Sequence, residues 1–327
     1  ADSAQHDHSW WGPAGHAKPA TETLRQALEK RMRPGQTLNF VPAFKDPCGR
    51  EFADKEAAVA VAQRADVIVY NVIEDCEIQG EGVSRTNLRL SGRQQEMLDA
   101  LAATGKPIVL VVETGRPIVL AEADKQADAI LIAWHPGTEG RTALAEILTG
   151  EFAPSGKLPM TFPRSEGQIP IAYNALPTGR PWTGSRYTTG YVDEAHTPLY
   201  PFGHGLSYTT FAYDPVVLSE PRMSLIGAID VDVRVRNTGS RTGQEVVQLY
   251  IRQLVASRSR PVKELRAFEK ITLKPGEART VRFRLKAQDL GFHDDAGRYA
   301  VEAGPFKVFA GGSSQTAQET DFLVTRE

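Results

Sequence analysis

The stretch Asp66-Val-Ile-Val-Tyr-Asn-Val72 leads directly into Ile73-Glu-Asp-Cys-Glu-Ile-Gln-Gly-Glu-Gly-Val-Ser-Arg-Thr-Asn-Leu-Arg-Leu90. The β-branched content and the length of the first run predict a buried strand. The spacing of Leu98 and Leu101 predicts a helix that begins near Ser91, which is placed to cap it. Open α/β folds carry their functional residues on loops that leave the carboxyl ends of buried strands. The segment between this strand and this helix is therefore the first candidate for a functional site.

This loop is acidic, and one of its carboxylates stands between two glycines. Its four carboxylates are Glu74, Asp75, Glu77 and Glu81. Gly80 and Gly82 give the backbone around Glu81 the freedom to adopt unusual φ/ψ values and to approach a ligand closely. We interpret Glu81 as a general acid/base. The alternative is a solvated acidic loop, and this stretch by itself favours that alternative.

The first half of the chain alternates helical and strand patterns. Predicted helices cover residues 21–30, 52–64, 91–104 and 138–148, and predicted strands cover residues 38–41, 66–72, 108–112 and 128–133. Asp54 is the expected cap of the second helix. Such alternation with short turns predicts an α/β sandwich, in which a mostly parallel sheet is covered by helices on both faces. We assign residues 1–163 to this domain.

The composition of the sequence changes after Gly150. Residues 151–181 are dense in proline and glycine, and we expect residues 164–211 to form an extended connector. From Tyr213 onward the apolar residues recur with a period of two, as in Ile229-Asp-Val-Asp-Val-Arg-Val-Arg236. Further strands of this kind are predicted at residues 245–251, 278–285 and 307–310. Residues 212–327 are therefore predicted to form an antiparallel β-sandwich.

Composition excludes several classes of protein. A chain of 327 residues is long enough for two domains, and its 41% hydrophobic and 24% charged residues are ordinary for a globular protein. A net charge of -2 makes nucleic acids and anionic membranes unsuitable partners. No apolar stretch approaches the roughly 20 residues needed to cross a bilayer. The chain does not begin with methionine, so we expect that a preceding segment has been removed.

Neither a metal nor a cofactor is expected. His6 and His8 have no third ligand nearby and are interpreted as surface histidines. Cys48 and Cys76 do not stand in a metal-ligand spacing, and they can pair only if the fold brings them together.

Two tryptophans occur in a loop near the start of the chain. Trp10 and Trp11 lie within a segment rich in glycine and proline. An aromatic face can hold the apolar side of a sugar ring, so either residue could form a substrate platform. The alternative is that both side chains pack beneath the loop.

Seven segments in order along the chain resemble the C-terminal part of glycoside hydrolase family 3, and within it the bacterial periplasmic β-glucosidases. The clearest is Gly80-Glu-Gly-Val-Ser-Arg85. The others are residues 103–111, 115–117, 134–140, 154–163, 199–211 and 260–270. The chain departs from the family pattern at Arg141, where a second glycine usually follows, and at Ile73, where glycine commonly precedes Glu74.

The resemblance implies an α/β sandwich followed by a fibronectin-III-like, immunoglobulin-like sandwich, with a catalytic (β/α)8 barrel that is not in this chain. In the family the barrel supplies the aspartate nucleophile, and no Ser-Asp-Trp or Ser-Asp-Tyr signature of that nucleophile occurs here. The loop matched by Glu81 supplies the general acid/base. Trp11 matches an aromatic residue on the aglycone side of the cleft, and we include Trp10 and Arg85 among the expected substrate-binding residues. Arg85 could also orient the loop by pairing with a carboxylate, or form a plain surface ion pair.

The expected activity is that of a retaining β-glucosidase, which removes terminal β-D-glucosyl residues from oligosaccharides or glycosides. Without the barrel, this chain is expected to be inactive. The resemblance also implies a periplasmic or secreted location. Alternatives are a non-catalytic carbohydrate-binding or interaction module, with Trp10 and Trp11 as its anchor, and a relative with β-xylosidase or N-acetylglucosaminidase specificity.

Overall fold

The computed structural model describes residues 22–74 and 78–326, which fold as two compact units. The first unit extends to Phe152 and includes Pro163–Ile169, and the second consists of Ala153–Phe162 and of the chain from Pro170 onward. These boundaries differ from the predicted boundary at 163 and the predicted connector 164–211. The reason is that Ala153–Phe162 pairs with a later segment, because Leu158 N–H donates to the His204 carbonyl at 2.8 Å. Among the described residues, no helix has the length and apolar character required to span a membrane.

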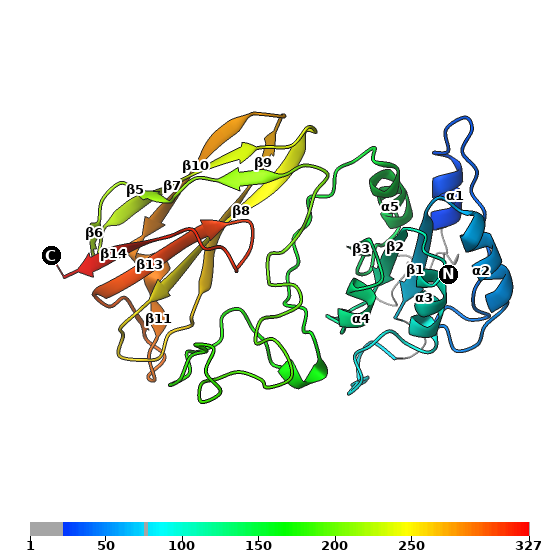
Figure 1. Cartoon of the computed structure of the whole chain (residues 1–327). Helices are drawn as coiled ribbons and strands as arrows, with labels where there is room; N and C mark the ends of the chain where they lie inside the picture. The colour runs from blue at the N-terminus through cyan, green and yellow to red at the C-terminus, as the bar shows by residue number, and fades with distance from the viewer. Residues whose placement is uncertain (1–21, 75–77, 327) are drawn as a thin grey trace. The chain divides into compact units, whose positions relative to one another are not determined.

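The first unit is built on a parallel sheet (Figure 1). Its strands are β1 (Ile68–Ile73), β2 (Ile108–Glu113) and β3 (Ala129–Ile132), in the spatial order β1-β2-β3. Tyr70 pairs with Leu110, and Leu110 pairs with Ile130. Because the strands are parallel, their carboxyl ends lie at the same edge of the sheet, and the segments that follow them lie together there.

Helices cover both faces of this sheet, as predicted. They are α1 (Leu24–Glu29), α2 (Lys55–Arg64), α3 (Gln94–Ala102), α4 (Ala121–Asp124) and α5 (Gly140–Thr149), with a 3₁₀ turn η3 (Glu166–Gln168). On one face the Tyr70 hydroxyl donates to the Gln94 carbonyl at the start of α3, at 3.0 Å. On the other face Val111 packs in one cluster with Leu24 of α1 and Leu144 of α5.

Local signals predicted one helix cap correctly and another wrongly. Asp54 caps α2 as predicted, because its side chain accepts from the Ala57 N–H at 2.8 Å. Ser91 does not cap α3, which starts at Gln94 and has no side-chain cap. The Ser91 hydroxyl instead lies 3.4 Å from the carbonyl oxygens of Cys48 and Ile73. The predicted strand at 38–41 was also wrong: these residues are irregular, and none of the described strands pairs with them.

The second unit contains an antiparallel sandwich of two sheets, as predicted (Figure 1). One sheet has the order β10-β7-β4 with β5 also on β7, and the other has the order β6-β14-β13-β8-β9, in which β6 pairs parallel to β14. The elements are β4 (Phe211–Tyr213), β5 (Val217–Leu218), β6 (Arg222–Ser224), β7 (Ala228–Asn237), β8 (Gly243–Gln253), β9 (Glu264–Leu273), β10 (Ala278–Lys286), η4 (Ala287–Leu290), β11 (Phe292–His293), β12 (Tyr299–Ala300), β13 (Gly304–Gly311) and β14 (Glu319–Thr325). The alternation in β7 places Ile229, Val231, Val233 and Val235 in the buried core.

Candidate active site

The acidic loop leaves β1 at the carboxyl edge of the parallel sheet and carries Glu81 at an exposed tip. Gly80 and Gly82 have φ values of 120° and 75°, which side chains with a Cβ rarely adopt. The Val83 N–H donates to the Gly80 carbonyl at 3.3 Å and closes the turn around Glu81. The carboxylate of Glu81 is therefore held out in solvent on a tight turn that two glycines make possible.

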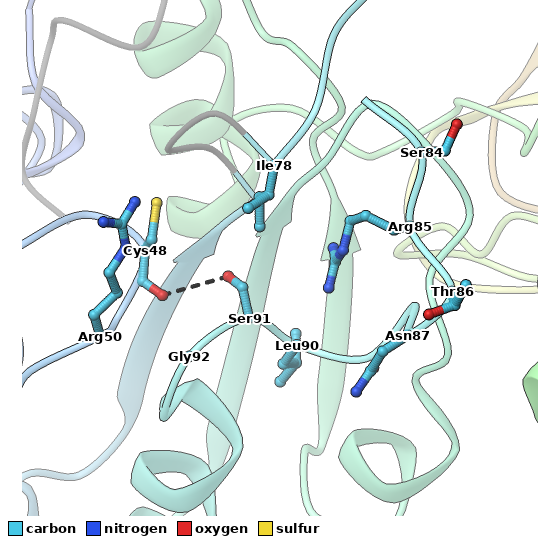
Figure 2. A pocket seen from close by; sticks show the side chains of 10 residues that line it. All are labelled: Cys48, Arg50, Ile78, Ser84, Arg85, Thr86, Asn87, Leu90, Ser91 and Gly92. Carbon is cyan, nitrogen blue, oxygen red and sulfur yellow. Dashed lines mark hydrogen bonds between the residues drawn. The ribbon is translucent and has the colours of Figure 1, made fainter. Parts of the chain in front are cut away.

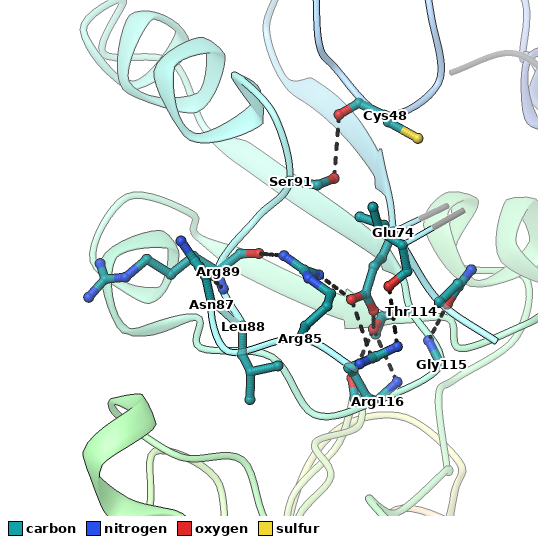
Figure 3. Close-up of polar contacts among 12 residues, drawn as sticks. Cys48, Glu74, Arg85, Asn87, Leu88, Arg89, Ser91, Thr114, Gly115 and Arg116 are labelled. Carbon is teal, nitrogen blue, oxygen red and sulfur yellow. Dashed lines mark hydrogen bonds and ion pairs between the residues drawn. The ribbon is translucent and has the colours of Figure 1, made fainter. Parts of the chain in front are cut away.

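The buried carboxylate of Glu74, at the end of β1, is the centre of the polar network behind this tip (Figure 3). Arg85 donates from Nη1 to Glu74 Oε1, and Arg116 Nε lies 3.4 Å from the same oxygen. The Thr114 hydroxyl donates to Glu74 Oε2 at 2.5 Å. We call these four residues, Glu74, Arg85, Thr114 and Arg116, the Glu74 clamp. It joins the loop after β1 to the turn after β2.

The turn after β2 also holds the chain just before Glu81. Arg116 Nη2 donates to the Ile78 carbonyl at 3.3 Å, and the Gly115 N–H donates to Gln79 Oε1 at 3.1 Å. A Cβ on Gly115 would lie 2.9 Å from His135 Nε2 and 3.0 Å from Gln79 Oε1, so glycine is needed for this close approach. The segments after β1, β2 and β3 therefore meet at one edge of the sheet.

The segment after β3 adopts an unusual backbone. Trp134 has φ of 53°, and it is the one described non-glycine residue with a positive φ. This conformation is costly for a bulky side chain and is typical of functional sites. The residue directly follows the end of β3 and precedes His135, which contacts the Gly115 turn.

A second buried carboxylate ends β2. Glu113 is 4% exposed and Arg141, at the start of α5, is 1% exposed. Arg141 Nη2 donates to Glu113 Oε2 at 2.9 Å, and Asn71 Nδ2 donates to Glu113 Oε1, also at 2.9 Å. Arg141, where the sequence departs from the family pattern, therefore has a buried partner, since its guanidinium neutralises the Glu113 carboxylate inside the unit.

A pocket of about 460 Å³ lies beside the loop (Figure 2). One wall is the loop itself, with the polar side chains of Ser84, Thr86 and Asn87, and another is formed by Cys48 and Arg50. Cys48 is disulfide-bonded. Cys76, the other cysteine of the sequence, lies outside the described residues.

The structure brings together some of the predicted site residues. Glu81 and Arg85 lie on the same loop, with Glu81 at its exposed tip and the guanidinium of Arg85 turned inward to Glu74. Trp10 and Trp11 lie outside the described residues. One alternative considered for Arg85 was that it orients the loop by pairing with a carboxylate, and Glu74 is that carboxylate. A direct contact of Arg85 with substrate stays a prediction.

Sequence reasoning missed the contribution of the turn after β2. Thr114 and Arg116 were not singled out, and Glu74 was named only as one of the four carboxylates of the loop. A signal was present, because Gly115-Arg-Pro117 is one of the segments that resemble the family and it follows a predicted strand. Parallel strands bring such segments to a common edge, so the turn was a candidate neighbour of the acidic loop.

Comparison with known proteins identifies the class to which this fold and site belong. Residues 3–208 match the Glycosyl hydrolase family 3 C-terminal domain, and residues 245–314 match the Fibronectin type III-like domain. The chain belongs to glycosyl hydrolase family 3 and carries the C-terminal part of such a protein.

The relatives that the chain matches include proteins named as glycosidases. The chain is 49% identical over 270 residues to the periplasmic β-glucosidase of Salmonella typhimurium, an alignment that covers 82% of this chain and 35% of that protein. It is 39% identical over 300 residues to a β-xylosidase of Formosa agariphila, covering 91% of this chain and 40% of the relative. The crystal structure of Listeria innocua β-glucosidase in complex with gluconolactone superposes with a TM-score of 0.84 at 36% identity, covering 92% of this chain and 42% of that one. The chain thus spans less than half the length of these relatives.

Proposed function

We propose that this chain supplies the general acid/base of a retaining β-glucosidase, whose nucleophile lies on a (β/α)8 barrel outside the chain. The observation that carries the proposal is the position of Glu81. It stands exposed on a glycine-flanked tip at the carboxyl edge of the parallel sheet, within the domain that matches the family. Relatives of this chain that are named β-glucosidases support the sugar class.

The chemistry requires two carboxyl groups about 5–5.5 Å apart on either side of the scissile bond. The nucleophile attacks the anomeric carbon while Glu81 donates a proton to the departing glycosidic oxygen. Glu81, now a carboxylate, then removes a proton from the water that hydrolyses the glycosyl-enzyme. An exposed acid on a tight turn is suited to this role, because it has to reach a substrate bound to another part of the enzyme.

Replacement of Glu81 tests the proposal in the enzyme that contains both this chain and its barrel. Glu81→Gln should lower kcat/KM by about 10²–10⁴-fold for glucosides with poor leaving groups, which need protonation, and much less for aryl glucosides with good leaving groups. Steady-state kinetics on a series of leaving groups measures the difference. Glu122→Gln is the control, since Glu122 is an exposed carboxylate on α4 that pairs only with Lys125 among the described residues. Equal losses for both kinds of substrate would point to a different acid.

β-Xylosidase activity is the second candidate, because the matching relatives include a β-xylosidase at 39% identity. The two sugars differ by the hydroxymethyl group on C5, and contacts to this group would come from the barrel. The ratio of kcat/KM for an aryl β-glucoside to that for the matching β-xyloside, measured in the assembled enzyme, decides between them.

We also propose a periplasmic or secreted location, as the Salmonella relative is named a periplasmic enzyme. The disulfide at Cys48 agrees with an oxidising compartment. Fractionation of cells that express the native gene, followed by detection of this chain, tests the location.

A further inference from the structure

The Glu74 clamp and the turn after β2 hold the loop on both sides of Glu81. Before Glu81, Ile78 and Gln79 are bound by Arg116 and by the backbone of Gly115. After Glu81, Arg85 is bound by Glu74. The segment between these anchors is therefore fixed at both ends to the carboxyl edge of the sheet.

The tip itself provides little further restraint. Within the part of the chain that the structure describes, the Glu81 side chain makes no hydrogen bond or ion pair. A Cβ placed on Gly80 or Gly82 would have no described atom within 4 Å apart from its chain neighbours, so neither glycine is held by packing. The position of the Glu81 carboxylate thus depends on the anchors on either side of it.

The two arginine anchors, Arg85 and Arg116, pair in turn with one buried charge. The Glu74 side chain is 4% exposed, whereas the side chains of Arg85 and Arg116 that face it are 14% and 24% exposed. One carboxylate therefore balances two guanidinium groups in a largely water-excluded place. Removal of this negative charge would leave two like charges against each other, and the Thr114 hydroxyl would keep only its contacts with the backbone of Arg116. The loop would then move to let the arginines reach water.

We propose that Glu74 is a positioning residue for catalysis, which holds the general acid in reach of the glycosidic oxygen through Arg85, Thr114 and Arg116. The inference rests on the proposed role of Glu81. Proton transfer needs the acid within hydrogen-bond distance of the leaving oxygen, and a displacement of about 1 Å can cost about 100-fold in rate. Loss of the clamp therefore impairs the protonation step more than it impairs sugar binding.

The test compares Glu74→Gln with Glu113→Gln in the enzyme that contains the barrel. Glu113 is a matched control, since it is an equally buried carboxylate at the end of the neighbouring strand. Its carboxylate pairs with Arg141 and Asn71, and its backbone carbonyl, which accepts from the Glu74 N–H, is unchanged in Glu113→Gln. Glu74→Gln should lower kcat about 10–100-fold for poor leaving groups, with a smaller loss for good ones and little change in KM. Glu113→Gln should change both kinds of substrate by the same factor. A uniform loss in Glu74→Gln, or the same selective loss in Glu113→Gln, would overturn the proposal.

A milder pair of variants keeps the test informative if Glu74→Gln folds poorly. Thr114→Val removes the hydroxyl that Glu74 accepts from, and Thr114→Ser retains it. The valine variant should show the selective loss and the serine variant should recover most of it. Hydrogen exchange of the amides of residues 78–89 gives a readout that does not need activity: it should speed up in Thr114→Val but not in Glu113→Gln. Unchanged exchange in Thr114→Val contradicts the proposal.

The Glu81→Gln experiment separates the two ideas. If Glu81→Gln shows no selective loss, the proposed acid is wrong and the proposed function fails. If Glu81→Gln shows the selective loss and neither clamp variant does, the function stands and only the positioning role of Glu74 is wrong.

Discussion

Gly80 and Gly82 show how single residues determine the geometry of the candidate site. Their positive φ values turn the chain sharply on each side of Glu81, and open space surrounds both. Any cost of a side chain at these positions therefore comes from backbone conformation and not from a clash. For an L-residue in the left-handed region that cost is about 1 kcal/mol.

A pair of glycine substitutions separates this backbone effect from general destabilisation. Gly82 and Gly105 have φ values of 75° and 69°, and at neither position would an added Cβ have an atom within 4 Å. Gly82→Ala and Gly105→Ala should each lower the free energy of unfolding by about 1 kcal/mol, measured by urea denaturation. Only Gly82→Ala should lower kcat of the assembled enzyme, because only that turn carries Glu81. Equal kcat values for the two variants would argue against a fixed tip.

At the scale of elements, strand β9 is preceded by a lysine that connects it to the loop between β13 and β14. Lys263 donates from Nζ to the carbonyls of Ser314 at 2.7 Å and Thr316 at 3.3 Å. Its ammonium also lies 4.2 Å from the centroid of the Phe309 ring. Burial lowers the pKa of Lys263 to about 8, and the charge of Glu319 opposes this shift. The charged form is thus less favourable in the folded protein than in the unfolded chain.

This pKa shift predicts how stability depends on pH. The ordinary pKa of lysine is 10.5, so between pH 8 and 10.5 the unfolded chain binds more protons at Lys263 than the folded protein does. The free energy of unfolding should therefore rise with pH across this window through this group. Tyr213 and Tyr250 act in the opposite direction only above about pH 10, since burial raises their pKa values in the folded state.

Lys263→Met isolates the contribution of Lys263. Urea denaturation at pH 7.5 and at pH 9.5 should show that the parent protein gains stability relative to the variant as the pH rises. Other titrating groups are common to both proteins and cancel in the difference. A difference between the two proteins that stays constant with pH would show that Lys263 keeps its ordinary pKa.

At the scale of the whole molecule, the proposed function gives the chain one side of a two-sided reaction. It spans 35% of the Salmonella relative and 42% of the Listeria structure, and the acid/base is the only catalytic carboxylate that we assign to it. A retaining mechanism needs a second carboxyl group on the opposite side of the sugar. The proposed activity therefore requires a polypeptide segment beyond these 327 residues.

Complementation tests this requirement. This chain, purified to a single intact mass, should hydrolyse no aryl β-glucoside, and addition of a separately purified barrel fragment of the same enzyme should restore hydrolysis. Addition of a barrel fragment whose nucleophilic aspartate is replaced by asparagine is the control and should restore nothing. Hydrolysis at an ordinary enzymatic rate by this chain alone would contradict the division of catalytic groups.

The sequence by itself determined those features that depend on residues a few positions apart. The alternation in residues 229–236 predicted which side chains of β7 are buried, and Asp54 caps α2 as its position predicted. The glycines on both sides of Glu81 were also visible in the sequence, whereas the acid/base role of Glu81 came from the family resemblance and stays a prediction. Periodicity and capping are local, so a linear pattern suffices to find them.

Only the tertiary structure decided which groups contact the loop that carries Glu81. Ser91 contacts the carbonyls of Cys48 and Ile73 and does not cap α3. Residues 38–41 form no strand, and none of the strands in the described ranges pairs with them. Thr114 reaches Glu74 from 40 positions away because β1 and β2 pair in parallel and end at the same edge. The physical reason is that a buried charge is stable only when it is paired with a group close to it in space. Strand pairing, and not distance along the sequence, determines which groups are close.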